Sequence, residues 1–247
     1  MSSSSTTRSE EILVLYGSQT GNSEYAASTL ANDAPDKLSN SSVSVTARHM
    51  QLDDFIEMER VKWPRLVVIV TSSYGVGQAP LGCYEFRKMC DAILTRQGNG
   101  ASEEINGLLS GVTYAMIGLG DSKYLTFFQN PTQIDKAMTI AGAKRVGPLG
   151  KADASGTGNE EQSEIILRWT TEIWSELKDV LHTAPTDETA KILDGVRRRT
   201  AEFCSQVLED WNGADDNDMN QTGFSKMIMI AIPVLIAIIV MMILNSR

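Results

Sequence analysis

A turn of small and hydroxyl-bearing residues, GSQTGNS at positions 17–23, follows a short apolar run. Backbone N–H groups at the start of a helix, together with Ser and Thr hydroxyls, can bind a phosphate dianion without any lysine or arginine. The turn lacks the Gly-Lys-Ser/Thr end of a Walker loop and the third glycine of the dinucleotide-binding fingerprint. Two interpretations stay open: a phosphate site of another kind, or an ordinary strand-to-helix turn.

Two later loops each place a tyrosine among glycines. One reads TSSYGVG over residues 71–77 and contains Tyr74, and the other reads GLGDSKY over residues 118–124 and ends on Tyr124. A tyrosine beside glycines is usually only an exposed rim residue. Two of them near a phosphate-binding turn favour a clamp for a flat ring, because tyrosine presents a large apolar face.

The apolar runs ahead of these loops are typical of strands that are buried on both faces of a parallel sheet. Strands are expected over residues 12–16, 43–46, 66–70, 112–117 and 145–149, and helices over residues 23–31, 81–96, 131–141 and 160–181. Alternating strands and helices predict a doubly wound α/β domain with helices on both faces of the sheet. Ligands of such domains bind at the carboxyl ends of the strands, where all three loops are expected.

Taken in order, the segments GSQTGNSEYAA, TSSYGVG, GLGDSKY and LGKADASG, followed by Trp169 and Trp174, resemble the FMN-binding domain of diflavin reductases such as NADPH–cytochrome P450 reductase and the sulfite reductase flavoprotein. The resemblance covers roughly residues 11–181. It implies a flavodoxin-like fold with a five-stranded parallel sheet, and FMN as the cofactor.

The resemblance also implies which residues hold the FMN. The phosphate would be bound by Ser18, Gln19, Thr20, Gly21, Asn22 and Ser23. The isoalloxazine ring would be held by Ser72, Ser73, Tyr74 and Gly75 from one loop and by Leu119, Gly120, Asp121, Ser122, Lys123, Tyr124, Phe127 and Phe128 from the next. Tyr74 and Tyr124 would flank the ring, and Asp153 would lie in an acidic loop that approaches it.

The chain departs from the family pattern beside the first tyrosine. The family usually reads Gly-Glu-Gly-Asp after this tyrosine, whereas the chain reads Gly75-Val76-Gly77-Gln78, so two acids are missing. Less negative charge near the ring is expected to make the flavin easier to reduce, or to weaken the docking of a basic partner. In the second loop, Phe128 stands where Asn or Cys is common.

The composition excludes several functional classes. The 247 residues carry a net charge of -9, which disfavours binding to nucleic acid and favours basic protein partners. The three cysteines form no Cys-x-x-Cys pair and the two histidines do not complete a zinc site, so no metal is expected. We expect the cysteines to be reduced thiols in the cytosol.

The C-terminal segment is predicted to cross a membrane. Residues 227–244 carry no charge, and Lys226 and Arg247 bracket them. At 1.5 Å per residue this segment spans about 27 Å, enough for a thin bilayer, whereas a buried core helix is the alternative. Residues 226–244 are therefore interpreted as a transmembrane tail anchor that contacts lipid. Subtracting the two positive charges of Lys226 and Arg247 from the net -9 leaves the head at -11.

The remaining segments predict the topology. Residues 1–10 are expected to be disordered and contain no secretory signal, which predicts a head on the cytosolic face of the endoplasmic reticulum or the mitochondrial outer membrane. Residues 185–212 carry an amphipathic helical pattern that fits either packing on the same domain or binding a partner. Residues 213–225, which include acidic positions, predict a flexible linker.

These observations predict a membrane-tethered FMN electron carrier, an oxidoreductase component without a catalytic acid, base or nucleophile of its own. The resemblance ends near residue 181, before the FAD and NADPH half of a diflavin reductase, so a separate FAD-containing NAD(P)H reductase is expected as donor. A redox protein, with haem or another centre, is expected as acceptor. The alternatives are a tail-anchored interaction module that keeps the fold without redox activity, and a flavin enzyme that acts directly on a small substrate such as a quinone.

Overall fold

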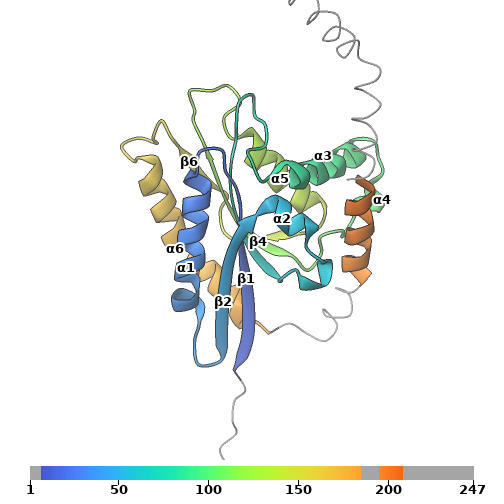
Figure 1. Ribbon diagram of the computed structural model, residues 1–247, viewed down its shortest axis with the longest axis horizontal. Helices are drawn as coiled ribbons and strands as arrows, with labels where there is room; N and C mark the ends of the chain where they lie inside the picture. The colour runs from blue at the N-terminus through green and yellow to red at the C-terminus, as the bar shows by residue number, and fades with distance from the viewer. Residues whose placement is uncertain (1–6, 185–194, 208–247) are drawn as a thin grey trace, which may run out of the picture. The chain divides into compact units, whose positions relative to one another are not determined.

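The computed structural model describes residues 7–184 and 195–207, and Figure 1 shows how their helices and strands are arranged. The chain divides into two compact units, residues 1–204 and residues 205–247. Every strand of the described residues belongs to the first unit.

A parallel sheet forms the centre of the first unit. Its strands are, in chain order, β1 (Arg8–Gly17), β2 (Val43–Gln51), β3 (Leu66–Ser72), β4 (Thr113–Gly120), β5 (Lys144–Arg145) and β6 (Gly150–Asp153). The strands lie in the order β2-β1-β3-β4-β5, and β6 also pairs with β4. All of these pairings are parallel, which confirms the predicted sheet.

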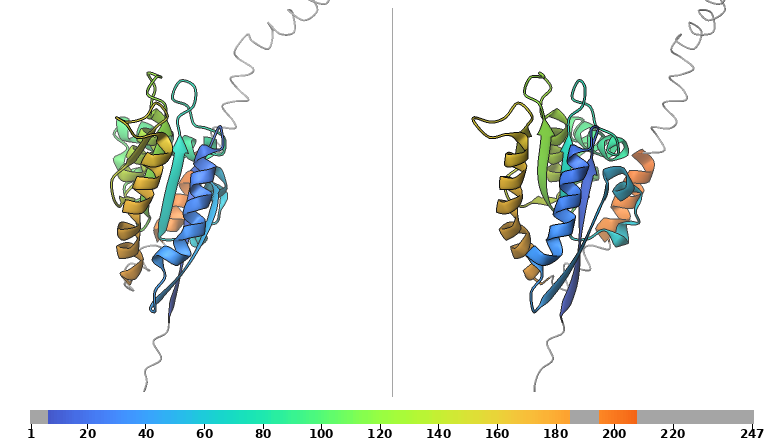
Figure 2. Two further views of the ribbon diagram at one scale, coloured as in Figure 1. Left: turned by 90° about the vertical axis from the view of Figure 1, so that its left-hand side faces the viewer. Right: turned by 60° about the vertical axis from the view of Figure 1, so that its left-hand side comes forward.

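Helices cover both faces of the sheet. α1 (Asn22–Leu38) and α6 (Gln162–His182) lie on one face, and α3 (Tyr84–Gly98) and α5 (Gln129–Ile140) lie on the other (Figures 1 and 2). Three short elements that the sequence did not predict are α2 (Leu52–Glu57), η1 (Arg60–Lys62) and α4 (Ser102–Ile105). The doubly wound arrangement is therefore confirmed.

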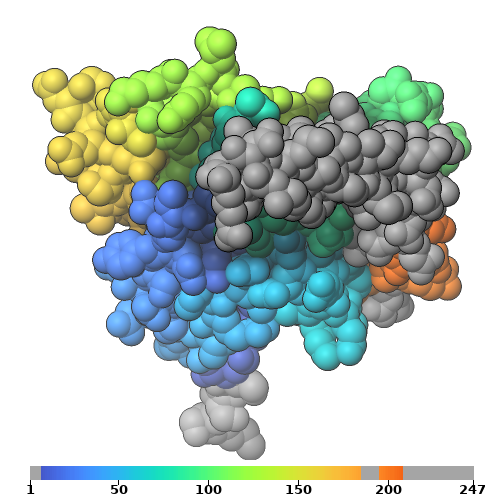
Figure 3. Space-filling model, turned by 45° about the horizontal axis from the view of Figure 1, so that its top comes forward, coloured from blue at the N-terminus to red at the C-terminus, as the bar shows by residue number. Residues whose placement is uncertain are grey.

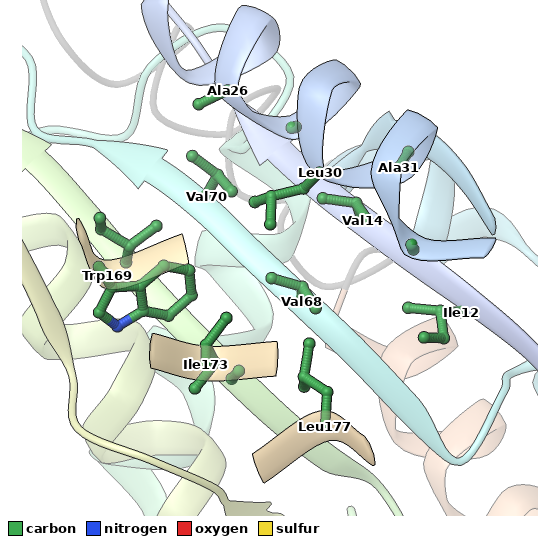
Figure 4. Packing of buried hydrophobic residues seen from close by; sticks show 14 of the residues in the cluster. Ile12, Val14, Ala26, Leu30, Ala31, Val68, Val70, Trp169, Ile173 and Leu177 are labelled. Carbon is green, nitrogen blue, oxygen red and sulfur yellow. The ribbon is translucent and has the colours of Figure 1, made fainter. Parts of the chain in front are cut away.

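The core between the sheet and the α1 and α6 layer is built from aliphatic side chains and one indole. Val14 and Val68 of the strands pack with Leu30 of α1 and with Trp169 and Ile173 of α6 (Figure 4). Fully burying an aliphatic or aromatic side chain of this kind stabilises the fold by about 1.5–3 kcal/mol. This packing fixes α1, and therefore the turn that precedes it, against the end of the sheet.

The strand expected over residues 145–149 does not form as one segment. It is broken between β5 and β6, so the described residues form six strands in place of the predicted five. Gly147 has a φ of 65°, in the left-handed region, and Pro148 has no N–H to donate to a strand ladder. The carbonyl of Pro148 accepts the indole N–H of Trp169 at 3.1 Å instead.

Two other predicted boundaries shift. Residues 8–10, expected within a disordered N-terminus, belong to β1, where Arg65 donates to the Glu10 carboxylate at 2.9 Å. The helix expected from residue 81 begins at Tyr84. The Asp53 carboxylate accepts the N–H of Tyr84 at 2.9 Å and so satisfies a donor of the first helical turn.

Residues 195–204 form a helix that packs on the same unit. The Thr200 hydroxyl donates to the carbonyl of Leu108 at 2.5 Å, and the Arg96 guanidinium lies 4.7 Å from the centroid of the Phe203 ring. The sequence left two interpretations of this segment open, packing on the same domain or binding a partner. For residues 195–204, the structure shows packing on the same domain.

The rest of the predicted C-terminal organisation lies outside the described residues. This applies to residues 185–194 and 208–212 of the predicted amphipathic segment, to the predicted linker over residues 213–225 and to the predicted span over residues 226–244. Within residues 7–184 and 195–207, no helix combines the length and the apolar character needed to cross a membrane.

Candidate functional site

A cavity of about 350 Å³ opens at the carboxyl ends of β1, β3 and β4. Figure 3 looks toward this end of the molecule, where the loops after β4 and β6, in yellow-green and yellow, lie near the start of α1, in blue. The cavity has the volume of an ordinary small-molecule site, typically about 300–1,000 Å³. It lies where the three loops were predicted to meet.

The structure brings most of the predicted site residues to this cavity. Those that line it are Gln19, Thr20, Asn22, Ser23, Ser72, Ser73, Tyr74, Gly75, Leu119, Gly120, Asp121, Tyr124 and Phe127. The predicted residues outside its lining are Ser18, Gly21, Ser122, Lys123, Phe128 and Asp153. The lining residues that were not predicted are Thr126, Ala154 and Gln162.

The turn of residues 17–23 leads β1 directly into α1. Ser18 Oγ accepts the N–H of Gly21 at 3.0 Å, and Gly21 precedes the helix with a φ of 90°, a conformation that glycine adopts without strain. The first N–H groups of a helix have no acceptor within the helix, so this end of α1 can bind an anion. Ser18 and Gly21 therefore shape the turn, while the residues between and after them line the cavity.

Gln19 carries a polar atom that lacks a partner. Its Oε1 is buried and has no hydrogen-bond partner among the described residues. A buried acceptor without a donor costs about 1–3 kcal/mol, so the site favours a ligand that supplies a hydroxyl or an N–H group. The ribityl phosphate arm of FMN fits both features, because it offers hydroxyls to Gln19 and a dianion to the start of α1.

Asn130, in the first turn of α5, holds the first tyrosine loop by hydrogen bonds. This side chain is fully buried, and its Nδ2 donates to the carbonyl of Ser72 at 2.9 Å, while Ser73 Oγ accepts the Asn130 backbone N–H at 3.0 Å. The Thr126 hydroxyl donates to the carbonyl of Gly75 at 3.2 Å. The two tyrosine loops are therefore joined to each other and to the start of α5.

Asp153 holds the second tyrosine loop by hydrogen bonds and lies outside the lining of the cavity. Its Oδ1 accepts the backbone N–H groups of Ser122 and Ser155, each at 2.9 Å. Burial raises the pKa of Asp153, but its hydrogen bonds outweigh burial, so the pKa lies below its usual value. Asp121 accepts the Ser155 hydroxyl at 2.6 Å, which lowers the pKa of Asp121. The Asp153 carboxylate thus joins two loops and does not line the cavity.

Phe128 packs beneath the cavity and does not reach the ligand space. It is buried, it precedes α5 with a φ of 64°, and a Cβ added to Gly118 would lie 2.5 Å from its ring. Lys123 belongs to the exposed tip of the same loop, where its N–H donates to Asp121 at 3.0 Å. The resemblance placed both residues in the FMN site. In the structure, Phe128 packs at the junction of β4 with α5, and Lys123 lies on the exposed part of the loop.

Gln162 is a lining residue that no sequence motif marked. It is the first residue of α6, and its Nε2 donates to the carbonyls of Ala152 at 3.1 Å and Gly120 at 3.3 Å. It therefore closes the cavity between the ends of β4 and β6. Only the packing of α6 on the sheet brings Gln162 to this position, so its spacing along the chain carried no signal.

Tyr74 and Tyr124 are exposed over 48% and 64% of their surfaces. An aromatic contact contributes about 0.5–1.5 kcal/mol beyond area burial, so a flat ring that covers these faces is stabilised. On the same two loops, Val76 is 74% exposed and Leu125 is fully exposed. The arrangement suits a planar, phosphorylated ligand whose edge stays close to solvent.

The lining suits binding more than acid–base catalysis. It contains no cysteine, histidine or lysine. Its one carboxylate, that of Asp121, already accepts hydrogen bonds from Ser155 and Lys123. Across the residues that the structure describes, no group of three or more His, Cys, Asp and Glu side chains is placed to bind a metal.

Comparison with known proteins identifies relatives. The flavodoxin family model matches residues 14–169. NADPH–cytochrome P450 reductase of Saccharomyces cerevisiae is 33% identical over 178 residues, which are 72% of this chain and 23% of that protein. Methionine synthase reductase of Caenorhabditis elegans is 34% identical over 143 residues, 58% of this chain and 19% of that protein. The chain therefore spans less than a quarter of the length of these relatives.

Among solved structures, a flavodoxin from Pseudomonas aeruginosa is similar with a TM-score of 0.47 and 23% sequence identity. The similarity covers 68% of this chain and 99% of that chain.

Replacing Asp153 with asparagine is expected to weaken the fold near neutral pH and to flatten its acid dependence. Because the native pKa is lowered from about 3.9, the carboxylate stabilises the fold above that pH, and this contribution is lost as the pH falls through the native pKa. Urea unfolding at pH 7 should show a loss of about 1–2 kcal/mol in D153N, as expected for hydrogen bonds to a charged group. At pH 3 the difference should shrink.

Asp33→Asn is the matched control for this measurement, because Asp33 is an exposed residue of α1 far along the helix from the turn. This variant should change the unfolding free energy little at either pH. An equal loss in D153N at both pH values would show that the charge of Asp153 does not hold the two loops together.

Proposed function

The chain belongs to the flavodoxin family, and from this membership we propose that it is an FMN electron carrier that connects an FAD-containing NAD(P)H reductase with an acceptor protein. Its FMN-binding domain matches those of diflavin reductases, as the sequence predicted. FMN is the cofactor of this domain. The donor as a separate protein, and an acceptor with haem or another redox centre, are parts of the proposal.

The observation that carries the proposal is the cavity between the two tyrosine loops. FMN supplies the ability to take up and release one or two electrons, so the protein only needs to bind and orient it. The start of α1 suits the phosphate, Gln19 suits a hydroxyl, and Tyr74 and Tyr124 suit the ring. The exposure of both tyrosines leaves the edge of a bound ring within reach of a partner surface.

The rim of this cavity supports docking of a second protein. Val76 and Leu125 place exposed apolar side chains on the two loops beside the tyrosines. The chain as a whole carries a net charge of -9. Exposed apolar side chains on an acidic protein favour a partner with an apolar contact patch and a basic surface.

We further propose that the protein is tethered to the cytosolic face of an intracellular membrane, the endoplasmic reticulum or the mitochondrial outer membrane. The support is the uncharged run of residues 227–244, which lies outside the described residues. A tether of this kind confines the carrier to the surface on which membrane-bound donors and acceptors diffuse, and so raises their encounter rate.

The apoprotein is expected to bind FMN and to discriminate against riboflavin. Because the start of α1 interacts with a dianion, loss of the phosphate should weaken binding at least tenfold, about 1.4 kcal/mol. Tyr124→Ala and Tyr74→Ala should each weaken FMN binding by about 1–3 kcal/mol through loss of a stacked face. Fluorescence titration of the apoprotein measures all four affinities.

The exposed Tyr25→Ala on α1 is the control for the tyrosine variants, because Tyr25 does not line the cavity. Its FMN affinity should equal that of the wild type. An apoprotein that FMN does not reconstitute would contradict the carrier function and favour the interaction module. Equal affinities for FMN and riboflavin would contradict the assignment of the turn over residues 17–23.

NADPH alone is expected to leave the bound flavin oxidised, and addition of an FAD-containing reductase should bleach its visible band. The second-order rate should fall as ionic strength rises, because attraction between oppositely charged surfaces fades once the Debye length is below about 10 Å. Photoreduction by the uncharged reagent deazariboflavin serves as control and should not depend on salt. Rapid bleaching by NADPH without the reductase would contradict a separate donor.

Deleting residues 227–247 is expected to release the protein from membranes. In cells, the full chain should sediment with membranes after carbonate extraction, and the shortened chain should be in the supernatant. Protease added to intact microsomes or mitochondria should digest residues 7–184 in the full chain. Protection of these residues would place the head in a lumen and contradict the proposed orientation.

A further inference from the structure

Arg60 is a buried arginine outside the cofactor site. It is the first residue of η1, and only 8% of its surface is exposed. Its Nη1 donates to the carbonyl of Met58 at 2.8 Å, and its guanidinium lies 4.1 Å from the centroid of the Trp63 ring. Its Nε is buried and has no hydrogen-bond partner among the described residues. The side chain thus retains an unused donor in a site with little access to water.

The charge of Arg60 has no carboxylate partner in the part of the chain that the structure describes. The neighbouring carboxylate, that of Glu59, pairs with Lys62 at 2.9 Å. The Cys204 thiol lies beside the guanidinium, but burial raises the pKa of this thiol more than Arg60 lowers it, so the thiol is neutral at physiological pH. A buried charge without a counter-ion is strongly unfavourable, so an anion bound beside Arg60 would stabilise the fold.

Arg60 lines a pocket of about 30 Å³ between residues 108–112 and the start of the helix over residues 195–204. Arg65 and Arg197 line it as well, and its lining contains no acidic residue. Arg65 already donates to the Glu10 carboxylate at 2.9 Å, so its charge is compensated. In Figure 2 the helix that contributes Arg197, in orange, lies beside the segment that contains η1.

The size of the pocket limits what can occupy it. The centre of a water-sized sphere can occupy about 30 Å³ of this pocket, so a monatomic anion fits. We propose that this pocket binds one chloride ion, which acts as the counter-ion of Arg60.

The pocket lies between the helix over residues 195–204 and the rest of the domain, so a bound ion would affect the attachment of this helix. Val196 and Thr200 of the helix over residues 195–204 form part of its wall, and Leu108 forms part of the opposite wall. The Thr200 hydroxyl bonds to the carbonyl of Leu108, so the helix is already docked there. A ligand that needs both walls stabilises the docked helix in proportion to its binding. Chloride therefore strengthens the attachment of this helix to the domain.

Chloride binding is tested directly on the full-length protein by the line width of the chloride NMR signal, with potassium gluconate keeping the ionic strength constant. The wild type should broaden the signal, and bromide should reverse the broadening by competition. Thermal unfolding should shift upward by about 2–4 °C between gluconate and chloride. No broadening and no shift would mean that the pocket holds only water, and would overturn the proposal.

Arg60→Met should abolish both chloride effects, because methionine fills similar space without the charge. Arg96→Met is the matched control: Arg96 also contacts the helix over residues 195–204, through the Phe203 ring, but it is paired with Glu104 at 3.2 Å. This control should keep the chloride response of the wild type. A chloride response that is unchanged in R60M would place the ion elsewhere and overturn the proposal.

A measurement on the wild type alone covers the case in which R60M does not fold. Trypsin cleaves after Arg197, Arg198 and Arg199, which lie in the helix that the pocket adjoins. Chloride should slow cleavage at these sites severalfold relative to gluconate, and a synthetic peptide of residues 195–204 should be cleaved equally fast in both salts. Equal cleavage rates of the protein in both salts would contradict a chloride ion that holds this helix in place.

Discussion

The parallel pairing of β3 with β4 sets Ser72 opposite Leu119, and the whole site depends on this register. Both tyrosine loops begin at these residues, so a shift of one position would turn every following side chain to the other face of the sheet. Asn130 ties the end of β3 to α5, because its buried amide donates to the carbonyl of Ser72 and to Thr71 Oγ1. The loops are therefore positioned by bonds within the protein, and a ligand enters a site that is already formed.

The sequence predicted the parts of this arrangement that follow from continuous apolar runs. Strands buried on both faces need such runs. The segments over residues 12–16 and 66–70 lie inside observed strands, and the segment over residues 112–117 does so from Thr113 onward. The segment over residues 145–149 does not form the predicted continuous strand, because Gly147 has a left-handed backbone and Pro148 has no N–H for a strand ladder. Gln162 and Thr126 were missed for another reason: their places in the cavity depend on long-range packing and on loop-to-loop contacts. The resemblance placed Phe128 at the ring, but in the structure it is buried against Gly118 and outside the lining of the cavity.

Charge is used in opposite ways at the two binding sites of this unit. The turn before α1 suits a dianion with neutral amides and hydroxyls, so it adds no fixed positive charge to an acidic protein. The small pocket beside η1 instead contains a guanidinium that the fold buries without a carboxylate. An anion is therefore bound at one site by oriented dipoles and at the other by a full charge. The first can release a large organic ligand for exchange, whereas the second favours a permanent small ion that stabilises structure.

The absence of two acids beside Tyr74 should affect the docking of a partner protein more than the redox potential of the flavin. A unit charge on an exposed loop about 8 Å from a charged ring changes its energy by only about 0.5 kcal/mol in water. The direction is toward easier reduction, because a negatively charged reduced cofactor is no longer repelled. Burying an aliphatic side chain in a protein interface contributes about 1.5–3 kcal/mol, and Val76 and Leu125 are both free to do so. In the proposed carrier function, Val76 thus replaces a weak electrostatic influence on the ring by a stronger apolar contribution to partner contact, so this loop would affect partner choice more than the redox potential.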